Sequence, residues 1–200
     1  IRDNATGVSS KSFREELGDI ANSSKERGKH KGFRGIGRLC GIGYCKELKF
    51  ITSYKGEKVK STMVCNAEKI RKMLMEKTKY TLDEVWDTNV TFYEEEENVD
   101  AHYFEVQLMD IKRESKDLLN IRNIKDYLSF VAPVPYKNKF IFRNDIYAHA
   151  KKNNHKIDEY KIMVNGAQIF KEYATRLKEK SGAGEKNYDE ISKLKFYDIK

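Results

Sequence analysis

Glycine clustering is the feature that most constrains what this chain can form. Six of its twelve glycines lie between positions 28 and 43, and three of them make the pattern Gly32-Phe-Arg-Gly35-Ile-Gly37. Because glycine has no Cβ, a backbone rich in it can turn sharply and approach a ligand closely. Basic side chains crowd the overlapping segment 25–34. This combination favours a phosphate site, and a solvated loop is the alternative.

The order of the glycines excludes two common phosphate-binding motifs. A dinucleotide-binding turn has the order G-x-G-x-x-G after a buried strand, whereas a basic loop precedes the glycines here. A P-loop needs Gly-Lys followed by Ser or Thr, and the sequence contains no such triplet.

Composition bounds the class of protein. The 200 residues are 39% hydrophobic and 12% aromatic, which supplies a core for one good-sized domain or two small ones. No stretch approaches the roughly 20 apolar residues of a membrane helix. The three cysteines, at positions 40, 45 and 65, fit no common zinc pattern and cannot all pair. They indicate free thiols in a reducing, cytoplasmic setting.

A second motif opens the chain. Residues 3–7 read Asp-Asn-Ala-Thr-Gly, and a short helix is expected over 9–22 with Ser9 as its cap and apolar residues at helical spacing.

Further elements are predicted along the rest of the first part. Strands are expected at 48–54, 59–65, 89–93 and 102–108, a helix at 67–78, and a solvated turn at Glu94–Glu97.

The second part of the chain changes character. A helix is expected over 117–131, ended by the two prolines, followed by a short strand at 139–142. Asn165-Gly166 is a favoured hairpin turn, so 161–170 is predicted to be a hairpin. We expect a helix over 171–180 and a flexible break at 181–184. A domain junction is expected near 115–135.

Together these motifs resemble the Bergerat-fold, or GHKL, ATPases, whose own motifs are D-x-G-x-G and G-x-x-G-x-G. From Gly7 to Ala21 the sequence is most similar to the heat-shock-90 type. The resemblance implies an α/β fold, an α+β sandwich with a Bergerat-type mixed or antiparallel sheet and helices on one face. Residues 1–115 would be the C-terminal part of that ATP-binding domain. Residues 116–200 would be a linker helix and the start of a second α/β domain of transducer or middle type.

The resemblance also implies the site. Asp3 would accept the exocyclic amine of adenine, and Gly7 would let the backbone pass close to the base. Ala5 departs from the family pattern, which has glycine there, and its methyl group would crowd the pocket. The implied ATP-binding residues are Asp3, Gly7, Val8, Asn22, Ser23, Lys25, Gly32, Phe33, Arg34, Gly35, Ile36 and Gly37.

The remaining parts of the site are expectations of the same kind. Segment 22–34 resembles the family's ATP lid, and Arg38 is a further candidate phosphate partner. A helix starting at about Gly37 would add its N–H groups to the phosphate site. His102 would open a strand that passes under the adenine. The catalytic Glu and the Mg-binding Asn are expected upstream of this chain, so the catalytic residues are unknown and no metal site is expected within it.

The function implied is ATP binding with slow hydrolysis that drives a conformational change, as in a heat-shock-90-like chaperone. The partners would be ATP or ADP, a protein client or DNA, and a second copy in a homodimer, with no membrane. Two alternatives stay open. One is a basic nucleic-acid-binding module, supported by the net charge of +8. The other is a degenerate scaffold without hydrolysis, suggested by Ala5.

Overall fold

The chain divides into two compact units, Ile1–Lys116 and Asp117–Lys200, each with a hydrophobic core of its own. The structure is a computed structural model and describes residues 1–19, 37–76, 80–171, 176–181, 184–190 and 194–196.

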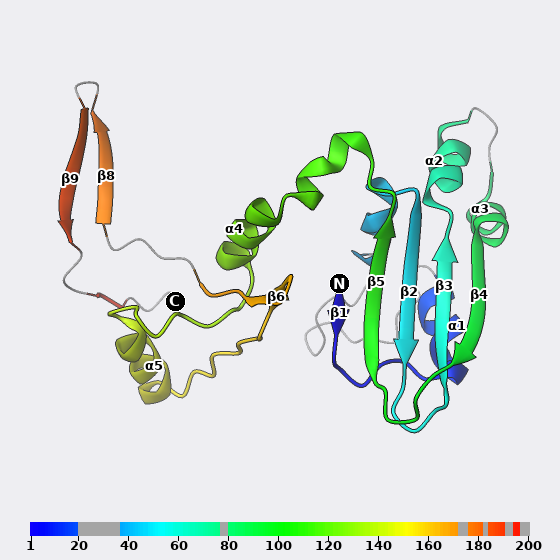
Figure 1. Cartoon of the computed structure of the whole chain (residues 1–200), viewed down its shortest axis with the longest axis horizontal. Helices are drawn as coiled ribbons and strands as arrows, with labels where there is room; N and C mark the ends of the chain where they lie inside the picture. The colour runs from blue at the N-terminus through cyan, green and yellow to red at the C-terminus, as the bar shows by residue number, and fades with distance from the viewer. Residues whose placement is uncertain (20–36, 77–79, 172–175, 182–183, 191–193, 197–200) are drawn as a thin grey trace. The chain divides into compact units, whose positions relative to one another are not determined.

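The first unit is built on a five-stranded antiparallel sheet (Figure 1). Its spatial order is β1-β5-β2-β3-β4, so the first and fifth strands lie side by side although a hundred residues separate them. The strands are β1 (Arg2–Asp3), β2 (Glu47–Ser53), β3 (Val59–Cys65), β4 (Val90–Glu96) and β5 (Tyr103–Met109).

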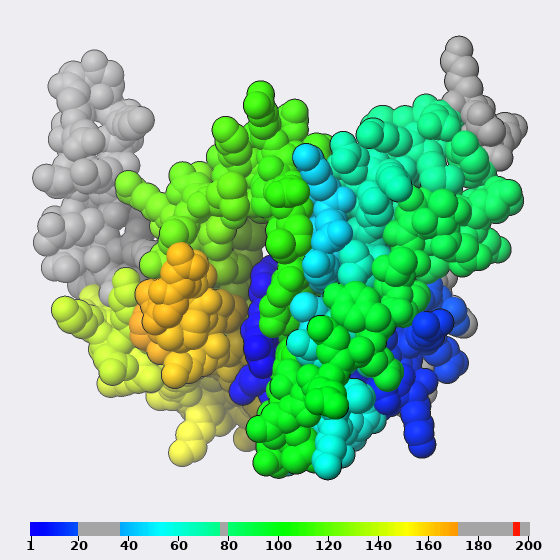
Figure 2. Space-filling model, turned by 45° about the vertical axis from the view of Figure 1, so that its right-hand side comes forward, coloured from blue at the N-terminus to red at the C-terminus, as the bar shows by residue number. Residues whose placement is uncertain are grey.

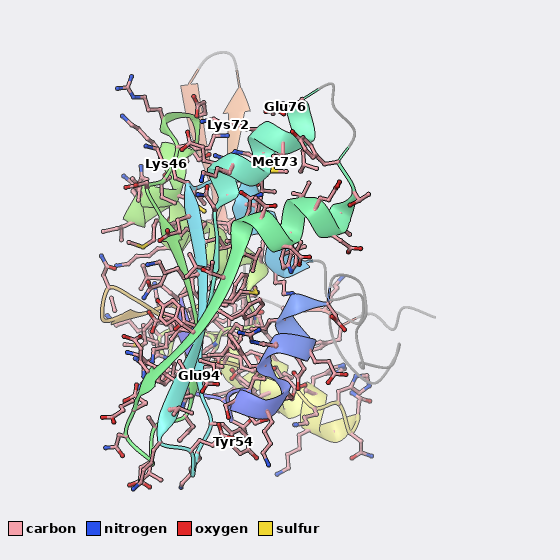
Figure 3. The ribbon with its side chains drawn as sticks, turned by 90° about the vertical axis from the view of Figure 1, so that its right-hand side faces the viewer. Lys46, Tyr54, Lys72, Met73, Glu76 and Glu94 are labelled. Carbon is pink, nitrogen blue, oxygen red and sulfur yellow. The ribbon has the colours of Figure 1, made fainter. Side chains whose placement is uncertain are left out.

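Helices cover one face of this sheet, as the edge-on view shows (Figure 3). They are α1 (Ser10–Gly18), the 3-10 helix η1 (Gly37–Gly43), α2 (Ala67–Met75) and α3 (Leu82–Asn89). In Figure 3, Tyr54 and Glu94 lie toward the α1 end of the sheet, whereas Lys72, Met73 and Glu76 lie on α2 at the other end. This mixed α/β architecture confirms the predicted fold class.

The core of the first unit lies between the sheet and its helices. Period-two alternation places Leu48 and Phe50 of β2 on the helix side, and the register sets Cys65 and Met63 of β3 opposite them. Phe13 of α1 and its neighbour Leu17 complete the contact from the helix layer. Burial of these apolar side chains is the main source of stability for such a unit.

Several sequence-based predictions hold in this unit and one is wrong. Ser9 does cap α1, although the helix ends at Gly18, and β3 spans the predicted residues. Glu94–Glu97 is not a turn, because β4 continues to Glu96. Its carboxylates are accommodated by the neighbouring strand, where Lys60 Nζ lies 3.4 Å from Glu95 and the Ser61 hydroxyl lies 3.4 Å from Glu94.

The second unit contains shorter elements around a small core formed by Ala132, Val134 and Ile169. Asn165 and Gly166 both have positive φ, 48° and 77°, which confirms the predicted hairpin turn. Its elements, starting with a 3-10 helix that crosses the unit boundary, are η2 (Arg113–Leu119), α4 (Ile121–Val131), α5 (Arg143–Lys152), β6 (Met163–Val164), β7 (Ala167–Gln168), β8 (Arg176–Ser181) and β9 (Gly184–Glu190).

Two predictions in this region are wrong, and a third has the right helix with a later start. The helix expected over 117–131 begins at Ile121, because the Asn120 side chain caps it by accepting from the next turn. Residues 139–142 form no strand. Phe140 and Phe142 are buried in this segment, and α5 follows it directly. The helix expected over 171–180 is the strand β8 from Arg176 onward, which pairs with β9 in an antiparallel ladder.

Candidate nucleotide-binding site

The loop between β1 and α1 carries the first motif. Asp3 pairs with Phe104 of β5, so β1 lies along the edge of that strand at the surface (Figure 2). Asp3 is exposed, and its Oδ1 accepts the Ala5 N–H at 3.0 Å. An ionised carboxylate has about four lone-pair sites, so this turn leaves Asp3 capacity for a ligand.

Gly7 is required by the backbone around it. Its φ is +75°, and a Cβ at this position would lie 2.0 Å from the carbonyl oxygen of Ser53. No side chain fits at that distance. The sequence predicted a close approach of Gly7 to the base; the close approach that the structure shows at Gly7 is to the end of β2.

A buried hydroxyl holds the same loop. Thr52 Oγ1 accepts the Val8 N–H at 2.9 Å and donates to the Tyr103 carbonyl at 2.8 Å. His102 adds a more exposed tie, with Nδ1 3.0 Å from the Ala5 carbonyl oxygen. Sequence reasoning missed Thr52, because alternation places it on a core face and no motif marks it.

The far end of the loop is fixed where α1 begins. Ser9 caps the helix, and the Glu57 carboxylate accepts the Ser10 N–H at 2.9 Å. A carboxylate at this end also complements the helix dipole. Val8, a predicted ATP-binding residue, is half-buried and packs against the core of the first unit. The loop is thus held at both ends by contacts from β2 and from the turn after it.

Polar contacts also order the start of β5 beside His102. The Tyr103 hydroxyl donates to Glu97 at 2.9 Å, and the Arg2 guanidinium lies 3.7 Å from the centre of the Tyr103 ring. Burial, with the Glu97 hydrogen bond, raises the pKa of Tyr103 to about 12. The Asn98 N–H and the Tyr103 hydroxyl lower the pKa of Glu97. The tyrosine therefore stays neutral and donates at neutral pH.

The end of the second motif leads into η1. Gly37 is its first residue, and a Cβ there would meet no described atom within 4 Å. At the other end of η1, Arg71 Nη1 donates to the Ile42 carbonyl and, at 2.7 Å, to the Cys45 carbonyl. The guanidinium of Arg71 therefore satisfies backbone oxygens that a short helix leaves unpaired.

The first motif and the helix that follows the second motif contact the same strand. Gly7 contacts the end of β2 at Ser53, and Gly41 of η1 contacts its beginning at Leu48, where a Cβ would lie 2.8 Å from the Leu48 side chain. Leu48 and Thr52 lie on the helix side of the sheet. The first motif and the helix that follows the second are therefore arranged along one face of β2.

The other predicted site residues have different outcomes. Arg38 donates to the backbone carbonyl of Asp19 at 2.8 Å, so part of its hydrogen-bonding capacity goes to the end of α1. The remaining predicted ATP-binding residues, and the segment proposed as a lid, lie outside the described residues; the residues are Asn22, Ser23, Lys25, Gly32, Phe33, Arg34, Gly35 and Ile36.

The described part of the chain contains neither a cluster of metal-binding side chains nor a membrane-spanning helix. No group of three or more His, Cys, Asp or Glu side chains there is arranged to hold a metal ion. No helix in those ranges is both long and apolar enough to cross a membrane.

Residues 1–96 match the family model described as "Histidine kinase-, DNA gyrase B-, and HSP90-like ATPase". No curated protein matches the chain. The matched range runs from the Asp3 loop through η1 to the end of β4, and so includes both motifs and the helix layer. This match and the one-sided antiparallel sheet support assigning this part of the chain to the GHKL superfamily of ATPases.

Proposed function

We propose that the first unit, residues 1–116, binds ATP. The observation that carries this proposal is that the family match includes a loop, Asp3–Val8, fixed against β2 at Gly7 and Val8. A fixed loop presents a carboxylate in one place, and a rigid polar group costs less entropy to engage than a mobile one.

The chemistry of the loop suits adenine. Asp3 offers acceptor oxygens to the exocyclic amine of adenine, whereas guanine has an acceptor at that position and would meet the carboxylate unfavourably. Ala5 fits without backbone strain, because it is not among the residues with positive φ, which are Asp110, Asn154, Asn165 and three glycines in the described chain. The methyl group in place of the family's glycine is therefore compatible with this loop.

The finer proposal is slow ATP hydrolysis that drives a conformational change in a heat-shock-90-like protein acting on a protein client or on DNA, as a homodimer. Its support is the resemblance over Gly7–Ala21 and the presence of a second unit with its own core, which would act as the transducer or middle-type domain. The resemblance would place the catalytic Glu and the Mg²⁺-binding Asn outside these 200 residues. Three free thiols favour a cytoplasmic location.

Calorimetric titration tests the proposal directly. ATP, ADP, GTP and a short DNA duplex are titrated separately into this chain and into a longer chain that carries the expected upstream helix. Binding of ATP and ADP in preference to GTP supports the proposal. Binding of DNA alone would instead identify a nucleic-acid-binding module, and binding of none of the four by either chain would identify a scaffold.

A further inference from the structure

We propose that Thr52 is a positioning residue of the ATP site: its buried hydroxyl joins the Asp3–Val8 loop to the start of β5 and thereby fixes the loop that carries Asp3. The effect on nucleotide binding rests on the proposed function. The effect on the loop does not, and it has a measurement of its own.

The two hydrogen bonds of Thr52 are assigned by chemistry alone. The Val8 N–H can only donate and the Tyr103 carbonyl can only accept, so the hydroxyl accepts from the first at 2.9 Å and donates to the second at 2.8 Å. Thr52 is 1% exposed, so water does not reach the group to replace either bond. Removal of the hydroxyl would leave the Val8 N–H and the Tyr103 carbonyl without this partner in a buried place.

The sheet register links Thr52 to Asp3. Thr52 of β2 pairs with Phe104 of β5, and Phe104 pairs with Asp3 of β1, so the three residues form one row across adjacent strands. Directly opposed residues point to the same face of a sheet. Thr52 and Asp3 therefore share the helix-side face, on either side of Phe104.

The other contacts between the loop and the sheet are either exposed to water or made by Ser53, the residue next to Thr52. His102 contacts Ala5 from an exposed position, where water competes for the bond. Gly7 packs against Ser53, and the Ser53 hydroxyl donates to the Ala101 carbonyl at 3.1 Å. Thr52 thus makes the most buried polar contact between this loop and the sheet, and loop residues 3–6 are themselves exposed.

Thr62 provides a matched control. It is also 1% exposed and lies on the adjacent strand β3, but the register places it opposite Ile51, on the other face of the sheet. Its hydroxyl oxygen is buried and has no hydrogen-bond partner among the described residues. A change from Thr to Val therefore removes the same atom at the two positions, with two hydrogen bonds lost at Thr52 and none at Thr62.

The experiment compares Thr52→Val, Thr52→Ser and Thr62→Val in the full 200-residue chain. ATP and GTP affinities are measured by calorimetry, and amide exchange of residues 4–8 is measured without nucleotide. Thr52→Val should lower ATP affinity about tenfold, since the buried Val8 N–H and Tyr103 carbonyl both lose their bond to the hydroxyl. It should also narrow the preference for ATP over GTP and speed exchange in 4–8. Thr52→Ser, which keeps the hydroxyl, and Thr62→Val should both behave like the parent.

Three results would overturn the proposal. They are parental exchange of residues 4–8 in Thr52→Val, an equal loss of affinity in Thr52→Val and Thr62→Val, and an unchanged ratio of ATP to GTP affinity in Thr52→Val. Failure of both the parent and the longer chain to bind ATP would refute the proposed function instead, and the exchange measurement would still decide whether Thr52 holds the loop. If Thr52→Val does not fold, Thr52→Ala and Thr62→Ala replace the pair.

Discussion

Gly7 lies directly against the backbone carbonyl of Ser53, so close that a Cβ on Gly7 would stand 2.0 Å from that oxygen. The contact joins the loop of the first motif to the end of β2. Since φ at Gly7 is also +75°, this position excludes a side chain both by distance and by conformation.

Substitution of Gly7 should therefore cost more stability than substitution of a glycine with strained φ alone. Gly56 has φ of +95° and no described atom within 4 Å of a Cβ, so Gly56→Ala should cost about 1–3 kcal/mol of backbone strain. Gly7→Ala adds a steric clash with the backbone and should cost clearly more. Urea denaturation of both variants measures the difference. Equal losses in free energy of unfolding would show that the loop moves away from Ser53 at little cost.

Asp3→Asn should weaken ATP binding without unfolding the loop. An asparagine keeps one carbonyl oxygen, which can still accept the Ala5 N–H that Asp3 Oδ1 accepts at 3.0 Å. It loses the charge and places an amide donor where a second acceptor was. Loss of a charge-assisted hydrogen bond to adenine should cost about 1.5–3 kcal/mol, about tenfold or more in affinity. Calorimetry with ATP measures this, and an unaltered affinity at an unaltered melting temperature would exclude the assignment of Asp3.

Local signals predicted much of the first unit. Alternation located β2 and β3 to within a residue, because their core face is continuous and their turn contains Gly56. Ser9 was identified as a cap because hydroxyl side chains there satisfy free N–H groups. The helix α3 was missed although its capping box, Thr81 with Glu84, was present in the sequence, since the apolar residues that follow are few.

The elements that were predicted wrongly depend on partners distant in sequence. The run of glutamates in β4 is typical of a turn when the sequence is read alone. In the sheet it is a strand, because Lys60 and Ser61 of the neighbouring strand contact its carboxylates. The polar segment β8 is strand only because β9 pairs with it. Thr52 shows the same limit in the site, because its importance comes from contacts with Val8 and Tyr103, which lie 44 and 51 residues away.

Alkaline pH should destabilise the first unit through its buried thiol. Burial, with Cys45 nearby, raises the pKa of Cys65 from 9.0 to about 12, and Arg38 opposes the shift. Above about pH 9 the unfolded chain loses this proton while the folded chain keeps it, so the free energy of unfolding falls as pH rises toward about 12. Denaturation curves at several pH values measure the slope.

Two cysteine variants identify the source of that slope. Cys65→Ala removes the buried thiol and should make the pH dependence shallower, whereas Cys40→Ala removes an exposed thiol and should leave it as in the parent. Tyr103, whose pKa is also raised to about 12, should supply part of the residual slope. The same slope in both variants would contradict the role of Cys65.

The glycine that ends the second motif offers the most direct test of a phosphate site. Gly37 and Gly43 are the two ends of η1, and at both of them a Cβ would meet no described atom within 4 Å. Neither has the positive φ that would strain a side chain. A valine should therefore be similarly tolerated by the folded unit at either end, which makes the two substitutions a matched pair.

A phosphate site at the second motif predicts that these two variants differ in nucleotide binding and not in stability without nucleotide. Gly37→Val should reduce ATP binding below detection, because the branched side chain would occupy space that the phosphates need beside the backbone N–H groups. Gly43→Val, on the end held by Arg71 and Lys112, should bind like the parent. Melting curves without nucleotide confirm that both variants are folded, and calorimetry with ATP gives the comparison. Parental affinity in a folded Gly37→Val variant would mean that this glycine lies outside any phosphate site, and the motif would lose its chemical role.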